Sequence, residues 1–463
     1  MQPTLHPAAT YLLVLTRRDA AELLLVPKGS GWTLPRVDVQ PHRRIAPQLT
    51  SAARTIWGVE ALCSFIPSLS ARGRVGEFNC AVMEAAGENS RAPAGILWVP
   101  RSTAEGRLEA SEAAMVRGTY DELDDYAKNS SPGNFAKTGW LRELYEWTQV
   151  QIDGWNLKLT GRFDQLNASP TFSLIRMETN GVAVWFKATG EPNTRELSVT
   201  TTLARLFPAS LPNILAIHQK WNGWLSEEII GKSLDEVTDL GAWEQAAGQF
   251  AELQIASIPR TADLLKSNLK DLRIPKLVER VDPFMERMRK LMAAQTKATP
   301  APLTNPEFEE LSDTLKESCR RLQEDGLPDA LGHIDLNPGN VLLSRNGPVF
   351  LDWAEGCVTH PLLPIHYLCE HLTRTGFERT PAVDHLTAAY LRPWASLYAP
   401  KDLNRIMSFA SLVAVFAYAV ATDSWRSLDA VHNPGLAPYF RSLTRRMHRE
   451  VRRISERSEL CFS

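Results

Sequence analysis

The stretch that decides the fold is HIDLNPGNVLLSRNGPVFLDW, residues 333–353. It contains two short runs of β-prone residues, 341–343 and 349–351, separated by the turn formers Ser-Arg-Asn-Gly-Pro. This order predicts a β-hairpin. If the strands pair symmetrically about the turn, Asn340 lies opposite Asp352, so two oxygen-bearing side chains sit side by side.

A third oxygen-bearing side chain, Asp335, lies five positions before Asn340, across a loop of Asn-Pro-Gly that favours tight, non-helical backbone. Three oxygen donors are therefore expected at one end of the hairpin. Such a set suits Mg²⁺, which keeps waters and takes substrate phosphates as further ligands. It also matches phosphoryl transfer, where one Asp orients the attacking hydroxyl while an Asn and a second Asp hold the metal. The alternative is that Asp335 and Asn340 only cap turns and that Asp352 only ends a strand.

The segments HIDLNPGNVLL and FLDW resemble the catalytic and metal-binding segments of the aminoglycoside phosphotransferase family, a small-molecule branch of the protein-kinase-like fold. The resemblance implies that Asp335 is the catalytic residue and that Asn340 and Asp352 bind Mg²⁺. It also implies that His333 braces the loop. Ile334 stands where the family usually has glycine, a change that affects backbone freedom but removes no functional group.

A kinase-like fold needs a smaller lobe before this stretch, with a lysine on a strand and a glutamate on the next helix. The segment VAVWFKATGEPNTREL supplies both. A strand-like run ends at Lys187, and Asn193 or Thr194 can cap a helix whose first turn contains Glu196. We therefore expect Lys187 and Glu196 to form an ion pair that binds the phosphates of ATP, although each residue type is more often a surface charge.

The segment WNGWLSEEIIGKSL is expected to join the two lobes. A strand ending at Leu225 passes into extended chain, and Gly231 lets the chain turn. The resemblance implies that the backbone around Glu227 and Ile229 binds the purine ring of the nucleotide.

The segment GRFDQLNASPTFSLIRME should form the hairpin over the phosphates, yet it contains no glycine-rich loop. Its turn offers hydroxyls and backbone amides instead, and phosphotransferases of this family also often lack the glycines. The missing loop favours a second hypothesis, a non-catalytic regulatory module that binds a nucleotide or metabolite within a kinase-like fold. The Asp-Asn-Asp-Lys-Glu set opposes that hypothesis.

The first 130 residues resemble a Nudix domain, a family that hydrolyses nucleoside-diphosphate derivatives with metal held by glutamates on one helix. The resemblance rests on TYLLVLTRRDAAELLLVPKGSGWTLPRVDV, a short helix closed by Gly58, and the later ILWVPRSTAEG. Arg54 is present, but Thr55 and Trp57 stand where acids are expected. Without clustered carboxylates a divalent metal has no ligands, so we expect no hydrolase activity. Nudix-type hydrolysis remains a third hypothesis, and a plain α+β domain is the alternative.

The chain of 463 residues exceeds one compact domain, so several cores are expected. We expect an α+β chain in which a protein-kinase-like bilobal phosphotransferase fold is preceded by a Nudix-like α/β/α-type domain. The expected parts are that domain with a linker helix at 1–150, the N-lobe at 151–235 and the helical C-lobe at 236–463. The linker helix should bury one face, made of Trp140, Leu141, Leu144, Tyr145 and Val150.

The composition excludes several classes of protein. With 51 basic and 53 acidic residues, the net charge of −2 predicts neither a nucleic-acid nor a membrane partner. Six scattered cysteines without a CxxC pair argue against a zinc site and a disulfide framework, and they favour the reducing cytoplasm. The first residues lack the order of a secretory signal. The longest apolar run, 406–422, is expected to be a buried helix.

Two charged features leave alternatives open. Arginines recur every four residues from 441 to 457. They form either a solvated helix face or a site for a phosphate-rich partner.

The acceptor is expected to be a small molecule with a hydroxyl group. Glu355, Glu370 and Glu378 either attract a cationic acceptor or face water.

Overall fold

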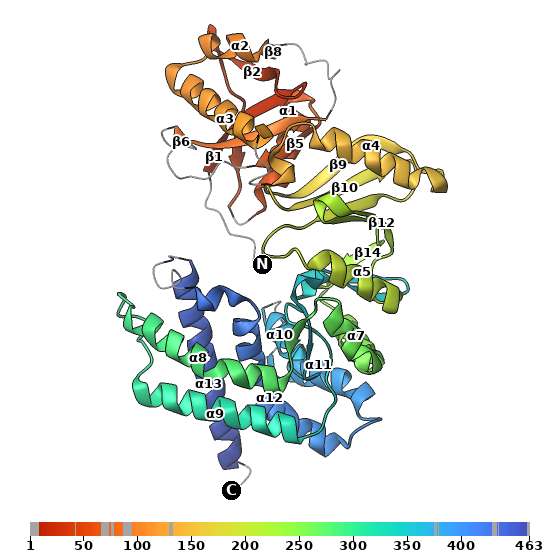
Figure 1. Cartoon of the computed structure of the whole chain (residues 1–463), viewed down its shortest axis with the longest axis vertical. Helices are drawn as coiled ribbons and strands as arrows, with labels where there is room; N and C mark the ends of the chain where they lie inside the picture. The colour runs from red at the N-terminus through yellow and green to blue at the C-terminus, as the bar shows by residue number, and fades with distance from the viewer. Residues whose placement is uncertain are drawn as a thin grey trace. The chain divides into compact units, whose positions relative to one another are not determined.

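The computed structural model describes residues 9–41, 43–65, 74–75, 78–86, 95–128, 133–374, 377, 379–427, 433 and 435–460 (Figure 1). The chain divides into two compact units. One unit contains Met1–Leu197 and Asn213–Glu228, and the other contains Ser198–Pro212 and Ile229–Ser463. The predicted division at residues 150 and 235 stays a prediction.

The first unit begins with a mixed sheet of eight strands within the described residues. Its path is β3-β2-β1-β7-β5, with β4 beside β1, β6 beside β7 and β8 beside β2. Strands β1 and β7 run parallel, whereas the other pairs are antiparallel. The strands are β1 (Ala9–Arg17), β2 (Glu22–Lys28), β3 (Gly31–Thr33), β4 (Arg36–Val39), β5 (Ala61–Phe65), β6 (Arg74–Val75), β7 (Phe78–Ala85) and β8 (Leu97–Pro100).

Helices cover both faces of this sheet. Successive side chains of β1 point to opposite faces, so they pack into two different cores. Leu13 packs in one core with Leu49 of α1, and Leu12 packs in another with Val116 of α3. Gly58 ends α1 in the left-handed region at φ 62°, as predicted for the helix stop. The layers are therefore helix, sheet and helix. The helices of this unit are α1 (Ile45–Trp57), α2 (Arg101–Ala104), α3 (Ala110–Lys128) and α4 (Trp140–Ile152).

A second, antiparallel sheet of the same unit has the order β12-β13-β11-β10-β9. Helix α4 packs against it, since Trp140 and Leu144 share a core with Phe163 and Phe186. Val150 is 69% exposed, so the predicted buried face of this helix is wrong at that position. The strands are β9 (Leu159–Ala168), β10 (Ser173–Thr179), β11 (Val184–Ala188), β12 (Ile214–His218) and β13 (Gly223–Glu227).

The second unit is mostly helical and has one large core. Two small sheets, β14-β17-β18 and β15-β19-β16, lie within it. Helix α5 (Glu196–Leu206) begins in the first unit and continues into this one. The strands of the second unit are β14 (Gly231–Ser233), β15 (Lys270–Leu272), β16 (Ala330–His333), β17 (Val341–Ser344), β18 (Gly347–Phe350) and β19 (Gly356–Thr359). Its other helices are α6 (Leu240–Ser257), α7 (Thr261–Lys266), α8 (Ile274–Ala293), α9 (Asn305–Glu324), α10 (Ile365–Leu372), α11 (Arg379–Trp394), α12 (Pro400–Val420) and α13 (Leu436–Leu460).

The long apolar run forms α12, as the sequence predicts. By length and composition alone, Leu403–Val420 is the one described stretch that could cross a membrane, a test that core helices also pass. Leu412, Val413 and Phe416 are fully buried in the core of this unit. These contacts agree with the predicted buried helix.

The arginine stripe of α13 is partly structural. Arg441 donates to the Leu291 carbonyl at 3.1 Å, and Arg445 donates to the Ala301 carbonyl at 3.1 Å. A solvated face is therefore the wrong description for these two arginines. Arg449 is exposed, and the side chain of Arg457 lies outside the described residues.

Candidate functional site

The predicted hairpin is present as β17 and β18. Ser344 pairs with Gly347 across a turn of two residues, Arg345 and Asn346. Gly347 has φ 117°, a conformation that a residue with a Cβ rarely adopts. The residue types of this turn, read from the sequence, therefore located the hairpin correctly.

The open end of the hairpin places Asn340 beside Leu351. The backbone N–H of Leu351 donates to the Asn340 carbonyl at 2.8 Å. The expectation that Asn340 lies opposite Asp352 is therefore wrong by one residue. The reason is that the turn is centred between Arg345 and Asn346 rather than on Asn346.

Asp352 leaves the hairpin in the left-handed region, with φ 60° and ψ 58°. Aspartate tolerates this region better than most residues, but the conformation still costs free energy. A short helical turn, Trp353–Glu355, follows, and the Trp353 indole donates to the Phe350 carbonyl at 2.9 Å. Such strain persists where the surroundings enforce it, often at functional sites. The fold therefore fixes the path of the chain at Asp352.

The loop before the hairpin is held by the backbone carbonyl of Asp335. It accepts from the Asn337 backbone N–H at 2.8 Å and from the Asn340 side-chain amide at 3.0 Å. Because the NH₂ group of Asn340 is used here, its Oδ1 is the side-chain atom suited to a metal. The turn formers of this loop thus orient the amide that the sequence singled out.

His333 joins the loop to the hairpin. It is fully buried at the end of β16, and its Nε2 lies 2.8 Å from the Leu351 carbonyl. Burial lowers the pKa of His333, and the carboxylates of Asp335, Asp352 and Glu355 oppose that shift. A neutral ring that donates Nε2–H to Leu351 satisfies this contact. This is the bracing position expected for His333.

The structure places Asp335, Asn340 and Asp352 on the loop and hairpin that His333 joins. The Asn340 side-chain amide donates to the Asp335 backbone carbonyl, and the charges of Asp335 and Asp352 oppose the lowering of the His333 pKa. Within the described ranges there is no group of three or more His, Cys, Asp or Glu side chains that could hold a metal. One amide and one carboxylate still fit Mg²⁺, which takes phosphates and waters as its other ligands. The catalytic and metal-binding roles remain predictions.

Lys187 and Glu196 form the expected ion pair in the first unit. Lys187 lies on the central strand β11, between β10 and β13, and Glu196 begins α5 with only 1% of its surface exposed. The Lys187 ammonium also lies 5.7 Å from the centre of the Trp224 ring. A buried carboxylate paired in this way holds the lysine in one position.

The segment proposed to bind the purine begins later than predicted. Strand β13 continues to Glu227, two residues beyond the expected end at Leu225. The Glu227 N–H donates to the Asn213 carbonyl at 3.2 Å. This N–H is therefore already hydrogen-bonded within the protein and is not free to bind a purine. Ile229 follows the end of the strand, and its role in nucleotide binding stays a prediction.

The turn without glycines, between β9 and β10, is closed by a hydroxyl. Ser169 Oγ accepts from the backbone N–H of Thr171 at 3.3 Å and of Phe172 at 2.9 Å. The Pro170 carbonyl accepts from the Phe135 N–H at 3.1 Å. The Ser169 side chain and the Phe135 backbone therefore fix this turn.

Two of the carboxylates considered for a cationic acceptor are already paired. Lys270 of β15 pairs with Glu355, and Arg446 of α13 pairs with Glu370. Glu378 lies outside the described residues. Attraction of a cation by Glu355 or Glu370 is therefore weakened. Lys270 carries no local sequence signal, so only the fold reveals this pair.

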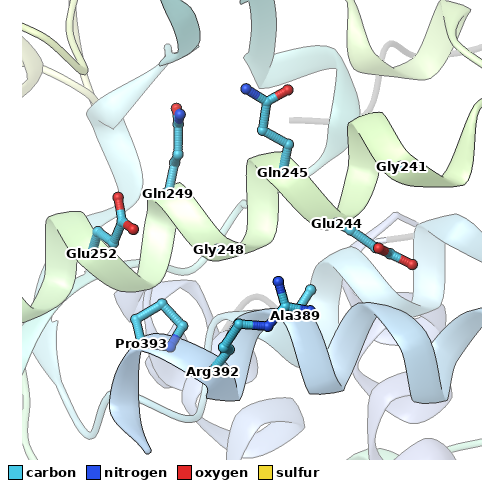
Figure 2. Close-up of a pocket in the computed structure, with 9 residues that line it drawn as sticks. All are labelled: Gly241, Glu244, Gln245, Gly248, Gln249, Glu252, Ala389, Arg392 and Pro393. Atoms are coloured by element: carbon cyan, nitrogen blue, oxygen red, sulfur yellow. The ribbon is translucent and has the colours of Figure 1, made fainter. Parts of the chain in front are cut away.

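A pocket of about 420 Å³ lies along α6 and α11 (Figure 2). None of the predicted site residues lines it. It is bounded by Gly241, Glu244, Gln245, Gly248, Gln249, Glu252, Ala389, Arg392 and Pro393. Its mixed charges indicate no particular ligand.

Comparison with known proteins identifies part of the chain. Residues 200–399 match the model of the APH family, described as the phosphotransferase enzyme family, so the chain carries an APH phosphotransferase family domain there. Asp335, Asn340 and Asp352 lie inside this range, whereas Lys187 and Glu196 precede it. No curated protein matches the chain.

Solved kinase structures resemble the chain at low sequence identity. The choline kinase from Cryptosporidium parvum Iowa II has a TM-score of 0.50 and 14% identity, over 68% of this chain and 97% of that chain. An ethanolamine kinase from Plasmodium vivax has a TM-score of 0.48 and 14% identity, over 72% and 93%. A spectinomycin phosphotransferase in complex with ADP and spectinomycin has a TM-score of 0.40 and 13% identity, over 68% and 98%. The first of these supports the mixed α+β kinase-like fold. A Nudix-like first domain is not shown.

Proposed function

We propose that this chain, which carries an APH phosphotransferase family domain at residues 200–399, transfers the γ-phosphoryl group of ATP to a hydroxyl of a small molecule. One observation carries the proposal. In the loop of that domain, the Asp335 carbonyl holds the Asn340 amide, and the hairpin ends at the left-handed Asp352. An oriented amide on this loop, with Asp335 before it and Asp352 after the hairpin, is a set of residue types that suits Mg²⁺ and phosphate chemistry.

The reaction forms a bond from the acceptor oxygen to the γ-phosphorus, and it breaks the bond from that phosphorus to the oxygen shared with ADP. Asp335 orients the acceptor hydroxyl and accepts its proton. Lys187, held by Glu196, contacts the phosphates of ATP. The backbone around Glu227 and Ile229 binds the purine. Most of the rate acceleration comes from positioning and charge neutralisation.

Asn340 and Asp352 are the residues proposed to hold Mg²⁺. The cation, when bound, would neutralise charge on the phosphates. Asn340 would present Oδ1, because its NH₂ group donates to the Asp335 carbonyl. Asp352 would present its carboxylate from a backbone conformation that the hairpin enforces.

The N-terminal part is proposed to be a Nudix-like domain without hydrolase activity, followed by an N-lobe at 151–235 and a C-lobe at 236–463. The helix-sheet-helix layers of the N-terminal part are compatible with the Nudix family. Helix α1, IAPQLTSAARTIW, contains no carboxylate to hold a metal. A cytoplasmic location is proposed, because the described cysteines are buried and unpaired. Neither a nucleic acid nor a membrane is proposed as a partner.

The alternative is a kinase-like module that binds a nucleotide or metabolite without transferring phosphate. The turn at Ser169–Phe172 supports it, because that turn has no glycine and uses Ser169 Oγ to bind its own backbone amides. Fewer free amides then remain to bind phosphates.

The test uses the full chain with Mg·ATP and a panel of amino alcohols, sugars and aminoglycosides. We expect one class of acceptor to stimulate ADP release. Asp335→Asn should abolish turnover and keep the thermal shift caused by Mg·ATP, whereas Asp352→Asn should lose that shift. Equal loss of nucleotide binding in both variants contradicts the assigned roles. Binding of Mg·ATP without ADP release for any acceptor supports the alternative.

A further inference from the structure

The backbone of Asp352 lies between two segments that the fold anchors separately. Before it, the Leu351 carbonyl lies 2.8 Å from Nε2 of the fully buried His333. After it comes the short helical turn Trp353–Glu355, whose first residue is also fully buried. The left-handed conformation of Asp352 persists only where its surroundings enforce it. The contacts of this turn are therefore part of what positions Asp352.

The last residue of the turn is held by both its backbone and its side chain. The Glu355 carbonyl accepts from the Ile334 N–H at 3.4 Å. The Glu355 carboxylate forms an ion pair with the ammonium of Lys270, at the start of β15. The side chains of Lys270 and Glu355 are 7% and 21% exposed, so salt and water screen this pair less than a surface pair. Two separate contacts thus fix the end of the turn.

Lys270 belongs to a strand that is itself fixed to the core of the second unit. Strand β15 runs parallel to β19, with Lys270 opposite Cys357 and Leu272 opposite Thr359. Thr359 Oγ1 donates to the Leu272 carbonyl at 2.9 Å, and the side chains of Leu272 and Cys357 are fully buried. Lys270 therefore contacts the turn from a strand that has little freedom to move.

A largely buried ion pair constrains geometry more than it adds stability. Taking two charges out of water costs about as much free energy as their attraction returns. Removing only one partner is much more costly, because the other charge is left buried and uncompensated. The pair of Lys270 and Glu355 therefore disfavours any arrangement in which the turn moves away from β15.

We propose that Lys270, through its ion pair with Glu355, is a positioning residue for Asp352. It holds the turn that follows Asp352 and so keeps the Asp352 carboxylate in place to bind Mg²⁺. This inference rests on the proposed function, in which Asp352 is a ligand of the cation. Residues behind metal ligands orient them, and replacing such a residue typically lowers metal affinity or activity by about 10–100-fold.

The binding test titrates the full chain with ATP by calorimetry, once with Mg²⁺ and once with EDTA in place of any divalent cation. Lys270→Met should weaken the binding of Mg·ATP by about tenfold. It should leave the binding of metal-free ATP unchanged, because in the proposal the pair positions only the ligand of the cation. An unchanged affinity for Mg·ATP, or an equal loss in both titrations, overturns the proposal.

Lys316→Met is the matched control. Lys316 of α9 pairs with Asp282 of α8 at 2.6 Å, and neither helix carries a residue of the proposed site. The same substitution there removes an ion pair from the same unit, and both affinities should stay as in the original chain. If Lys316→Met loses as much Mg·ATP affinity as Lys270→Met, the loss of any lysine in this unit has the same effect, which overturns the proposal.

A double variant separates position from stability. Lys270→Met combined with Glu355→Gln removes both charges, so no buried charge is left uncompensated. The double variant should therefore resist urea better than Lys270→Met alone, and it also allows the test if that single variant does not fold. Its affinity for Mg·ATP should stay low, because the ion pair is still missing. If the affinity returns together with the stability, the pair serves folding only and the proposal is overturned.

Asp352→Asn distinguishes failure of this inference from failure of the proposed function. If Asp352→Asn binds Mg·ATP as tightly as the original chain, the metal-binding role in the proposed function is wrong, and the inference fails with it. If Asp352→Asn loses that affinity while Lys270→Met and the double variant keep it, the proposed function stands and only the positioning role of Lys270 is wrong.

Discussion

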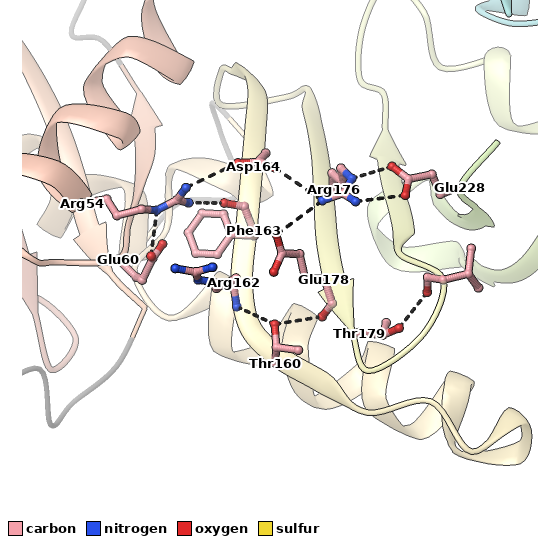
Figure 3. Close-up of polar contacts among 11 residues, drawn as sticks. Arg54, Glu60, Thr160, Arg162, Phe163, Asp164, Arg176, Glu178, Thr179 and Glu228 are labelled. Carbon is pink, nitrogen blue, oxygen red and sulfur yellow. Dashed lines mark hydrogen bonds and ion pairs between the residues drawn. The ribbon is translucent and has the colours of Figure 1, made fainter. Parts of the chain in front are cut away.

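Arg54 of α1 donates from Nη2 to the backbone carbonyl of Phe163 in β9 at 2.6 Å (Figure 3). The same guanidinium lies 2.7 Å from Glu60 and 3.6 Å from Asp164. The arginine found by the Nudix resemblance thus links the first sheet to the second. It forms a structural contact between two sheets of one compact unit.

The line of charges continues past Asp164. Arg176 of β10 lies 3.6 Å from Asp164 and also donates to Glu228 at 3.0 Å. Glu228 is next to Glu227 and Ile229, the segment proposed to bind the purine. The position of that segment is therefore tied, through side chains on β9 and β10, to the N-terminal sheet.

Arg54→Ala should lower the free energy of unfolding by about 1 kcal/mol. The variant loses one hydrogen bond from a charged guanidinium to the Phe163 carbonyl. The Arg54 side chain is 34% exposed, so water screens its ion pairs with Glu60 and Asp164 and they contribute little. Urea denaturation measures the change. Arg142→Ala is the control, since its ion pair with Asp19 is more exposed on both sides and should contribute almost nothing. Equal changes for the two variants contradict the contact's role.

Gly133→Ala should disturb the turn between β9 and β10. A Cβ at residue 133 would lie 2.1 Å from the Pro170 carbonyl oxygen, so the backbone must shift. We expect a loss of about 1–3 kcal/mol in unfolding free energy, typical of overpacking, and a higher KM for Mg·ATP. Gly154→Ala meets nothing within 4 Å and serves as the control. An unchanged KM would show that the turn does not contact the nucleotide.

Local sequence patterns located the elements that bear the candidate site, but not their register. The turn formers between 344 and 348 predicted the hairpin, and the apolar run before Lys187 predicted β11. Ser344 pairs with Gly347, so only two residues remain in the turn. Asn340 therefore lies beside Leu351 and not beside Asp352, because the number of turn residues sets the register of the strands. Strand β13 likewise continues to Glu227, where pairing with Val184 extends it beyond the local pattern.

Contacts between segments that lie far apart in the chain could not be predicted from local sequence patterns. Tyr367 lies in an apolar helical segment, and nothing nearby in the chain indicates that its ring stacks on Tyr418 of α12. The core shared by Leu62, Trp140 and Phe163 is equally hidden, since it joins segments that the composition separates. Predictions from periodicity identify which residues are buried, whereas the partner of each residue depends on the tertiary fold.

Two substitutions of Asp352 separate its charge from its backbone conformation. Asn tolerates the left-handed region, so Asp352→Asn should unfold like the original chain while losing affinity for Mg·ATP. Asp352→Ala should lose the same affinity and about 1 kcal/mol of stability in addition, because a Cβ without a local hydrogen-bonding group disfavours φ 60°. Isothermal titration with Mg·ATP and urea denaturation measure the two effects. Retained affinity in both variants contradicts the metal-binding role.

His360 should make the stability of the chain depend on pH. It is buried in the second unit, and its Nδ1 accepts from the Leu362 N–H at 3.4 Å. Burial lowers the pKa of His360 to about 3. In the unfolded chain the pKa returns to about 6.5, so below that pH the unfolded state binds a proton that the folded state does not. The free energy of unfolding should therefore fall as the pH falls from about 6.5 towards 3, by up to about 1.4 kcal/mol per pH unit.

The variant His360→Asn isolates this contribution, because the amide oxygen can still accept from Leu362 and has no proton to gain in this range. Urea denaturation at pH 7 and pH 5 gives the loss of stability for each chain, and the loss should be smaller in the variant than in the original. His385→Asn, at an exposed position, should lose as much stability between the two pH values as the original chain. If His360→Asn shows the full loss as well, other groups cause the acid sensitivity, and the neutral, buried state assigned to His360 is wrong.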